Sequence, residues 1–173
     1  HRIARRQRQM CIRDRNHAQG VALSCYLLKI KGKIFMPTPT PNQKVEQVKM
    51  FGKQYVEMVL VGDTFDDSYH EAIKECEKFG KPLVHPFNDP KVIEGQGTVG
   101  LEIIQQSKIP IDYIFIPVGG GGLASGLSTA VKALSPKTKI IGVEPAGAPS
   151  MSQSIDKGEI IKLNQIEKFV DGA

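Results

Sequence analysis

The chain has 173 residues, of which 40% are hydrophobic and 6% aromatic, with no tryptophan and a net charge of +5. No apolar run is long enough to span a bilayer, and the three cysteines show no C-x-x-C spacing that would favour a disulfide framework or a zinc site. The length suffices for one good core or two small lobes, so composition predicts a soluble α/β protein in a reducing compartment.

The excess positive charge lies in the first fifteen residues. They hold six of the 23 basic residues and one of the 18 acids, and no arginine follows Arg15. A basic arm for nucleic acid or anionic lipid, or a mitochondrial-type targeting peptide, is one interpretation. We favour another, that residues 1–15 are foreign sequence joined to a truncated reading frame, and we leave them out of the predicted fold.

From residue 16 onward, helices and strands are predicted to alternate. Asn16 is a good N-cap for the first helix, and Thr64-x-x-Asp67 resembles a capping box. A boundary between two lobes is expected near 86–90, and 92–97 is a short glycine-containing stretch. The predicted helices cover 18–30, 43–51, 64–79, 98–107, 123–134 and 151–155, and the predicted strands cover 33–37, 55–61, 81–85, 109–118 and 139–144. This alternation is typical of βαβ units and a parallel sheet.

Four consecutive glycines, 119–122, stand between a predicted strand and a predicted helix. Glycine allows positive φ and close approach of a ligand to the backbone, and the N–H groups there and at the helix N-terminus can bind an anion. We therefore predict a phosphate site. A P-loop would need Gly-Lys-Ser/Thr, whereas Leu123 follows Gly122. A dinucleotide fingerprint with Glu144 as its acidic residue and the single phosphate of another cofactor remain open.

Seven motifs occur in one order, and together they give a resemblance that covers 16–173. They are Asn16-His17-Ala18-Gln19-Gly20-Val21-Ala22, Lys33-Ile34-Phe35-Met36-Pro37, Gly62-Asp63-Thr64-Phe65-Asp66-Asp67, His85-Pro86-Phe87-Asn88-Asp89-Pro90, Glu94-Gly95-Gln96-Gly97-Thr98, the glycine loop, and Gly142-Val143-Glu144-Pro145-Ala146-Gly147. The chain resembles threonine dehydratase (threonine ammonia-lyase), of the fold type II pyridoxal-phosphate enzymes.

The resemblance implies an α/β fold with a three-layer, parallel-sheet βαβ architecture like the β subunit of tryptophan synthase. It places a small cofactor and substrate lobe over 16–87 and a partial large lobe, with the phosphate-binding loop, over 88–173. The chain has too few predicted helices to cover the sheets of both lobes. We therefore expect it to be an internal fragment.

The cofactor implied by the resemblance is pyridoxal 5′-phosphate. Its phosphate would be bound by the backbone N–H groups of Gly119, Gly120, Gly121, Gly122 and Leu123, and its 3-hydroxyl by Asn16. Glu144 matches a position that binds a divalent cation in some relatives, but the partner acid is replaced here by Ser150. A lone carboxylate is a poor cation ligand, so no metal is expected.

The implied reaction is the α,β-elimination of water from threonine, or serine, to give a 2-oxo acid (2-oxobutanoate from threonine) and ammonia. The family carries its Schiff-base lysine in Ser-x-Lys-x-Arg-Gly, and no lysine here has that context. We therefore expect no catalytic residue in this chain, and no activity as written.

Three alternatives are kept: a serine racemase or another dehydratase of the same fold, a dinucleotide-binding oxidoreductase, and a nucleic-acid binder acting through the basic head. The favoured resemblance implies a small amino-acid substrate, a cytoplasmic homo-oligomer when intact, and no nucleic-acid or membrane partner.

Overall fold

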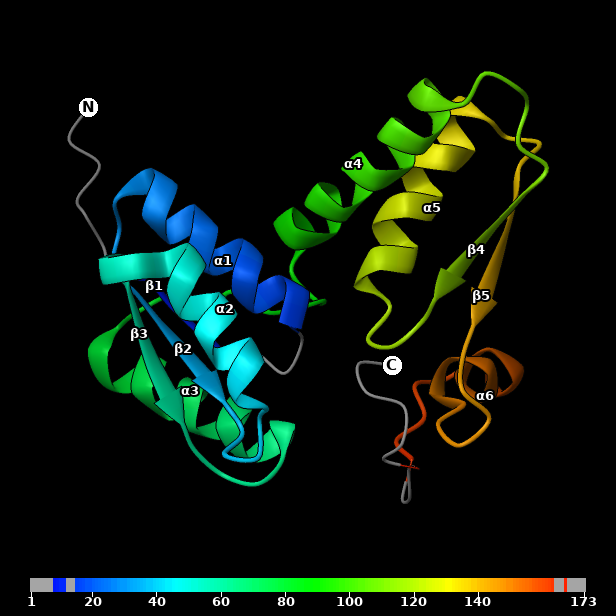
Figure 1. Cartoon of the computed structure of the whole chain (residues 1–173). Helices are drawn as coiled ribbons and strands as arrows, with labels where there is room; N and C mark the ends of the chain where they lie inside the picture. The colour runs from blue at the N-terminus through cyan, green and yellow to red at the C-terminus, as the bar shows by residue number, and fades with distance from the viewer. Residues whose placement is uncertain (1–7, 12–14, 164–166, 168–173) are drawn as a thin grey trace. The chain divides into compact units, whose positions relative to one another are not determined.

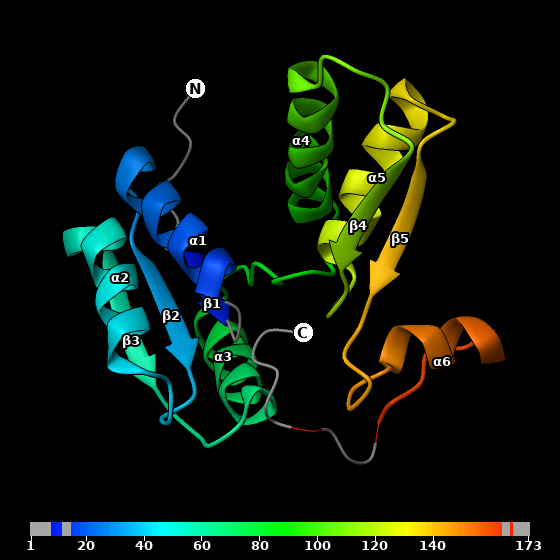
Figure 2. The same cartoon turned by 45° about the vertical axis from the view of Figure 1, so that its right-hand side comes forward.

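The computed structural model describes residues 8–11, 15–163 and 167. The chain divides into two units, His1–Pro86 and Phe87–Ala173, and each is an α/β unit with a parallel sheet (Figures 1 and 2). The predicted fold class, α/β with parallel βαβ units, is thereby confirmed. No helix in the described part of the chain is long and apolar enough to cross a membrane.

The first unit contains a three-stranded parallel sheet in the order β1-β2-β3. In chain order its elements are β1 (Arg8–Cys11), α1 (Arg15–Leu28), β2 (Gly32–Met36), α2 (Asn42–Gly52), the 3₁₀ turn η1 (Lys53–Tyr55), β3 (Val56–Leu60) and α3 (Phe65–Phe79).

Successive side chains of the central strand β2 enter different cores, which makes this unit three layers deep. Ile34 and Met36 pack with α1 and α2, whereas Phe35 packs with Ala72 of α3. Figures 1 and 2 show α1 and α2 on one face of the sheet and α3 on the other. All three of these β2 side chains are at most 4% exposed, as expected for a parallel strand covered on both faces.

Both ends of α3 follow the sequence prediction. Thr64 accepts a hydrogen bond from the backbone N–H of Asp67, and the Asp67 carboxylate accepts one in return from the N–H of Thr64 at 2.9 Å. The same carboxylate accepts a hydrogen bond from the Thr64 hydroxyl at 2.7 Å, and this bond, followed by those from the N–H groups of Thr64 and Asp63, lowers the pKa of Asp67. Gly80 closes the helix in the left-handed conformation, with φ of 60°.

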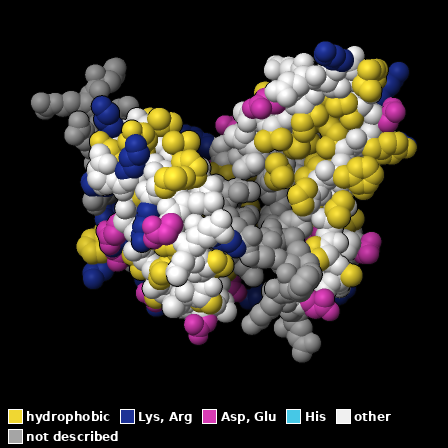
Figure 3. Space-filling model, viewed as in Figure 1, with side chains coloured by type: hydrophobic (Ala, Val, Ile, Leu, Met, Phe, Trp, Pro, Cys, Tyr) yellow, Lys and Arg dark blue, Asp and Glu magenta, His cyan; other side chains and the backbone are white. Residues whose placement is uncertain are grey.

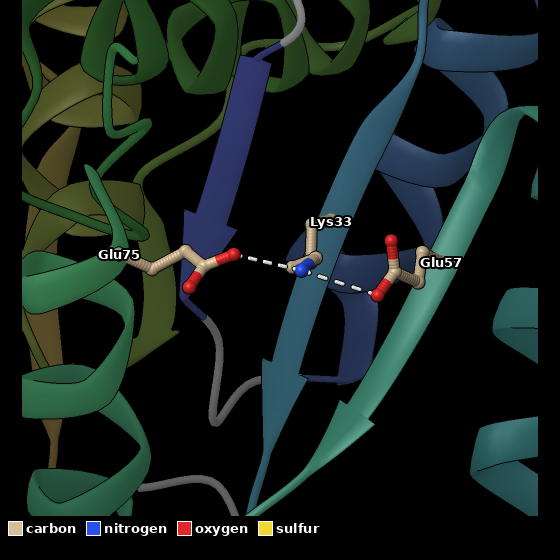
Figure 4. Close-up of polar contacts among 3 residues, drawn as sticks. All are labelled: Lys33, Glu57 and Glu75. Atoms are coloured by element: carbon tan, nitrogen blue, oxygen red, sulfur yellow. Dashed lines mark hydrogen bonds and ion pairs between the residues drawn. The ribbon is translucent and has the colours of Figure 1, made fainter. Parts of the chain in front are cut away.

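Lys33 of β2 joins the sheet to α3 through two carboxylates (Figure 4). Its Nζ lies 2.7 Å from Oε1 of Glu75 on α3 and 3.1 Å from Oε1 of Glu57, its register partner on β3. The hydrogen bond to Glu75 is the largest cause of a raised pKa for Lys33; burial opposes it, and the interactions with Glu57 reinforce it.

Raising the pH above the ordinary lysine value of 10.5 is expected to destabilise the first unit through Lys33. Because the pKa is raised on folding, this stabilisation is complete below the pKa of the unfolded chain and is lost as pH rises through the folded pKa. Urea unfolding at neutral and alkaline pH measures the loss, and Glu75→Gln should flatten it. Glu71→Gln, which removes only the exposed pair of Lys74 with Glu71, is the matched control. Equal pH slopes in all three proteins would contradict this assignment.

The second unit has two parallel strands with helices packed on one face. In chain order its elements are α4 (Pro90–Gln106), β4 (Tyr113–Pro117), α5 (Gly122–Leu134), β5 (Lys139–Val143) and α6 (Ser150–Lys157). Its core is formed by Ile116, Leu127 and Val131, with Ile103 and Ile104 of α4 packed against them.

The helix α4 begins about eight residues earlier than predicted, and it includes the stretch 92–97 that we expected outside any helix. Asp89 caps it by accepting a hydrogen bond from the Lys91 N–H at 2.9 Å, and Pro90 occupies its first turn. Glycines in both helices, Gly100 in α4 and Gly126 in α5, allow the two helices to pack closely. A Cβ at Gly100 would lie 2.9 Å from the carbonyl oxygen of Leu127, and one at Gly126 only 2.1 Å from that of Ile93. Tertiary packing therefore outweighs the poor helix propensity of glycine.

Three further sequence expectations differ from the structure. Residues 8–11, which we left out of the fold, form β1 in register with β2. Asn16 is the second residue of α1 rather than its N-cap, because the helix begins at Arg15, a better helix former. The strand expected over 81–85 is reduced to a single bridge at Leu83, since Pro82 has no N–H to donate to a ladder.

The second sheet leaves its other face open. Phe115 is 69% exposed, Tyr113 52% and Val143 49%. Figure 3 shows hydrophobic side chains gathered over β4 and β5 on this face. Parallel sheets ordinarily have both faces covered by other elements, whereas this sheet is covered by helices on one face only.

Candidate functional site

The glycine loop connects the end of β4 to the start of α5. The backbone N–H of Val118 donates to the carbonyl oxygen of Val143 at 2.9 Å, which extends the pairing of the two strands up to the loop. Gly121 then adopts φ of 81° and ψ of −9° as the N-cap of α5. This left-handed conformation is strained for any residue with a Cβ, so the chain needs glycine at this position.

Phe87 fills the space beside two other glycines of the loop. A Cβ at Gly120 would lie 2.4 Å from the Phe87 ring, and one at Gly122 would lie 2.9 Å from the Phe87 backbone. The sequence prediction attributed these glycines to close approach by a ligand; the structure shows that they also admit Phe87. This contact joins residues more than thirty positions apart, and no local pattern in the sequence indicated it.

The first turn of α5 has the properties of an anion site. No side chain in the described part of the chain caps it at Gly121, and no acidic residue lies in the turn. The first N–H groups of a helix have no partner within the helix, and they carry the positive end of its dipole. A loop of this shape, followed by an uncapped helix, fits the phosphate group of a cofactor.

The other helix that follows a strand of this sheet, α6, is capped by a carboxylate. Oε1 of Glu144 accepts the N–H of Met151 at 2.7 Å, and Oε2 accepts the N–H of Ser152 at 2.8 Å. The Ser150 hydroxyl lies 3.4 Å from Oε1. Glu144, which the sequence left open as a ribose-binding acid, therefore uses both oxygens within its own unit. Among the residues the structure describes, no group of three or more His, Cys, Asp or Glu side chains is arranged to hold a metal ion.

The predicted site residues fall in different units. Gly119, Gly120, Gly121, Gly122 and Leu123 lie together at the junction of β4 and α5 in the second unit, and the Leu123 side chain packs into the core. Asn16 lies in α1 of the first unit. The residues that sequence reasoning missed are Phe87 and Met151, both beside the glycine loop.

The fold and the glycine loop are those of a known class of enzymes. The family described as "Pyridoxal-phosphate dependent enzyme" matches residues 6–173, and the chain belongs to this family. The match begins within the arginine-rich head, so it includes the strand β1. The loop sequence was compatible with a dinucleotide or with the single phosphate of another cofactor. The family uses pyridoxal phosphate, a cofactor of the second kind.

Individual relatives narrow the likeness to threonine dehydratases, as the motifs predicted. The chain is 57% identical to the biosynthetic L-threonine dehydratase of Halalkalibacterium halodurans over 164 residues, and 51% identical to that of Bacillus subtilis. These alignments cover 95% of this chain but only 40% and 39% of the two relatives. The chain thus spans about 40% of their length.

Two solved structures, a threonine deaminase and a serine racemase, are also similar to the chain. Threonine deaminase isoform 2 from Solanum lycopersicum superposes with a TM-score of 0.87 at 46% identity, over 96% of this chain and 44% of that one. Maize serine racemase superposes with a TM-score of 0.83 at 36% identity, over 92% of this chain and 47% of that one.

Proposed function

We propose that this chain is part of a pyridoxal-phosphate-dependent threonine dehydratase, an enzyme that eliminates water from L-threonine, and also from serine, with release of ammonia. From threonine the product is 2-oxobutanoate. The high identity to two bacterial dehydratases supports this proposal. We further propose, from the resemblance, a small amino-acid substrate and a cytoplasmic homo-oligomer for the whole enzyme.

In this proposal the glycine loop binds the cofactor phosphate. The N–H groups of Gly119, Gly120, Gly121, Gly122 and Leu123 donate to its oxygens. From the resemblance alone, we also propose Asn16 as the residue that would hydrogen-bond the 3-hydroxyl of the pyridine ring. The observation that carries the proposal is the first turn of α5, which no described side chain caps, directly after a residue held at φ of 81°. A dianionic phosphate there is stabilised by both the N–H groups and the helix dipole.

Pyridoxal phosphate, when bound, supplies the electron sink for the elimination. The role of this chain is to hold the phosphate end, because no lysine here lies in the Ser-x-Lys-x-Arg-Gly context of the family's Schiff-base lysine. We therefore propose that the chain binds the cofactor without a dedicated covalent link and does not catalyse the elimination. We keep the division into lobes over 16–87 and 88–173 as part of the same proposal.

A racemase of the same fold is the second candidate. The likeness to maize serine racemase supports it, because that enzyme superposes almost as well as the plant threonine deaminase. Both enzymes belong to one fold and would place the phosphate in the same loop. The two candidates therefore differ in substrate preference and not in the role of this chain.

Titration of the chain with pyridoxal 5′-phosphate and with pyridoxal tests the proposed site. Since the chain has four tyrosines and no tryptophan, isothermal calorimetry is the better readout. We expect pyridoxal phosphate to bind, inorganic phosphate to compete with it, and pyridoxal to bind at least tenfold more weakly, since it lacks the charged group that the helix terminus recognises. NAD should not compete.

Borohydride treatment followed by mass spectrometry tests the absence of the Schiff-base lysine. We expect scattered, substoichiometric labelling of surface lysines. Stoichiometric labelling of one lysine would overturn the proposal that this chain lacks the Schiff-base residue, while equal affinity for pyridoxal and its phosphate would overturn the phosphate site.

A further inference from the structure

The helix α6 owes its start to a residue outside the helix. Its N-cap is Pro149, which supplies no side-chain hydrogen bond. Glu144 replaces that cap from the far side of the loop 145–149, with one carboxylate oxygen on the N–H of Met151 and the other on that of Ser152. These are the second and third helical residues, whose N–H groups no helix can satisfy internally.

The same turn of α6 touches the glycine loop. A Cβ built on Gly121 would lie 3.1 Å from Cε of Met151, so the Met151 methyl group sits beside the Gly121 Cα. Met151 therefore joins two contacts: its N–H is held by Glu144, and its side chain ends against the residue with positive φ. All three residues belong to the second unit.

The opposite neighbour of the loop is Phe87, which occupies the space beside Gly120 and Gly122. Four consecutive glycines have more backbone freedom than any other four residues, and a loop of that composition keeps one conformation only when its surroundings hold it. Phe87 and Met151 supply the atoms nearest to a Cβ built at Gly120, Gly121 or Gly122. Of these, Met151 is the one beside Gly121, where φ is positive.

We propose that Glu144 is a positioning residue for the phosphate-binding loop: it fixes the first turn of α6, and Met151 in that turn holds Gly121 in the conformation that directs the loop N–H groups toward an anion. This inference rests on the proposed function for the phosphate site. It assigns to Glu144 a role distinct from ligand contact, because its oxygens accept hydrogen bonds from Met151 and Ser152.

The experiment uses ¹⁵N-labelled full chain and two readouts at a temperature where every variant is folded. The first is the amide chemical shifts of Gly119–Leu123 without ligand, and the second is their titration with inorganic phosphate, which does not react with lysines. The variants are Glu144→Ala, Glu144→Gln, Met151→Ala and Met151→Leu. Asp156→Asn, which removes one negative charge from an exposed position of the same helix, is the matched control.

We expect Glu144→Ala to shift the Gly121 and Gly122 amides and to weaken phosphate binding about fivefold, the size of a lost helix cap. Glu144→Gln should have an effect between that of Glu144→Ala and none. Its amide oxygen can accept a hydrogen bond from one of the two N–H groups, but its NH₂ group opposes the other. Met151→Ala should shift the same amides while leaving the Ser152 amide in place, and Met151→Leu should restore them. Asp156→Asn should change neither readout.

The two readouts test the phosphate site and the positioning role of Glu144 separately. If the unaltered chain shows no phosphate-dependent shifts, the proposed function fails, and the ligand-free amide shifts still decide whether Glu144 positions the loop. If phosphate binds and Glu144→Ala alters only α6 amides, the positioning role is overturned and Glu144 is merely a helix cap.

Discussion

Replacing Gly126 with alanine is expected to lower the free energy of unfolding of the second unit by about 3 kcal/mol, the upper end of the usual cost of overpacking. The new Cβ would lie 2.1 Å from the carbonyl oxygen of Ile93 and 2.8 Å from the backbone nitrogen of Gly97. Both are main-chain atoms of α4, so no side chain can rotate away and the two helices must separate. Urea unfolding followed by circular dichroism measures the change.

Gly95→Ala is the matched control in the same pair of helices. Gly95 lies inside α4, and a Cβ there would meet nothing within 4 Å. Because alanine loses less backbone entropy in a helix, this change should stabilise the unit by about 0.5–1 kcal/mol. If both substitutions had the same sign, the close approach of α4 to α5 at Gly126 would be disproved.

Replacing Gly121 with alanine is expected to weaken phosphate binding at least tenfold. A residue with a Cβ loses about 1–2 kcal/mol in the left-handed region, so the loop should leave φ of 81° and the first N–H groups of α5 should lose their common direction. The added methyl would also lie 3.1 Å from Cε of Met151 and press on α6. Calorimetric titration with pyridoxal 5′-phosphate gives the change in affinity.

Gly80→Ala separates backbone strain from site chemistry. Gly80 has φ of 60° and no atom within 4 Å of a Cβ, and it lies at the end of α3 in the first unit. This variant should lose about 1 kcal/mol of stability through the same strain while its affinity for the phosphate stays unchanged. A comparable loss of affinity in both variants would mean that Gly121 acts through general stability and not through the loop.

The elements that could be predicted from the sequence are those with local signals. The capping box of Thr64 and Asp67, the end of α3 at Phe79, and the apolar strand before the glycine loop each depend on neighbouring residues. The resemblance to threonine dehydratases rested on motifs of this kind, and the family match agrees with it. Local chemistry was enough to place the loop between a strand and a helix and to predict that it binds an anion.

The features that could not be predicted are set by contacts between distant residues. The arginine-rich composition gave no indication of β1, which forms by pairing with the distant strand β2. The glycines of α4 argue against a helix until α5 is packed on them. Likewise, nothing near Glu144 in the sequence shows that its carboxylate caps a helix, nor that the Met151 of that helix meets Gly121.

The sheet of β4 and β5, open on one face, has a thermodynamic consequence. The heat capacity increase on unfolding comes mainly from apolar surface that becomes hydrated, and Phe115, Tyr113 and Val143 are already largely hydrated in the folded state. The heat capacity increase on unfolding of the second unit should therefore be smaller than the usual value of about 12–15 cal/mol/K per residue. A smaller increment flattens the curve of stability against temperature, so this unit should respond more weakly to both cooling and warming than a sheet covered on both sides.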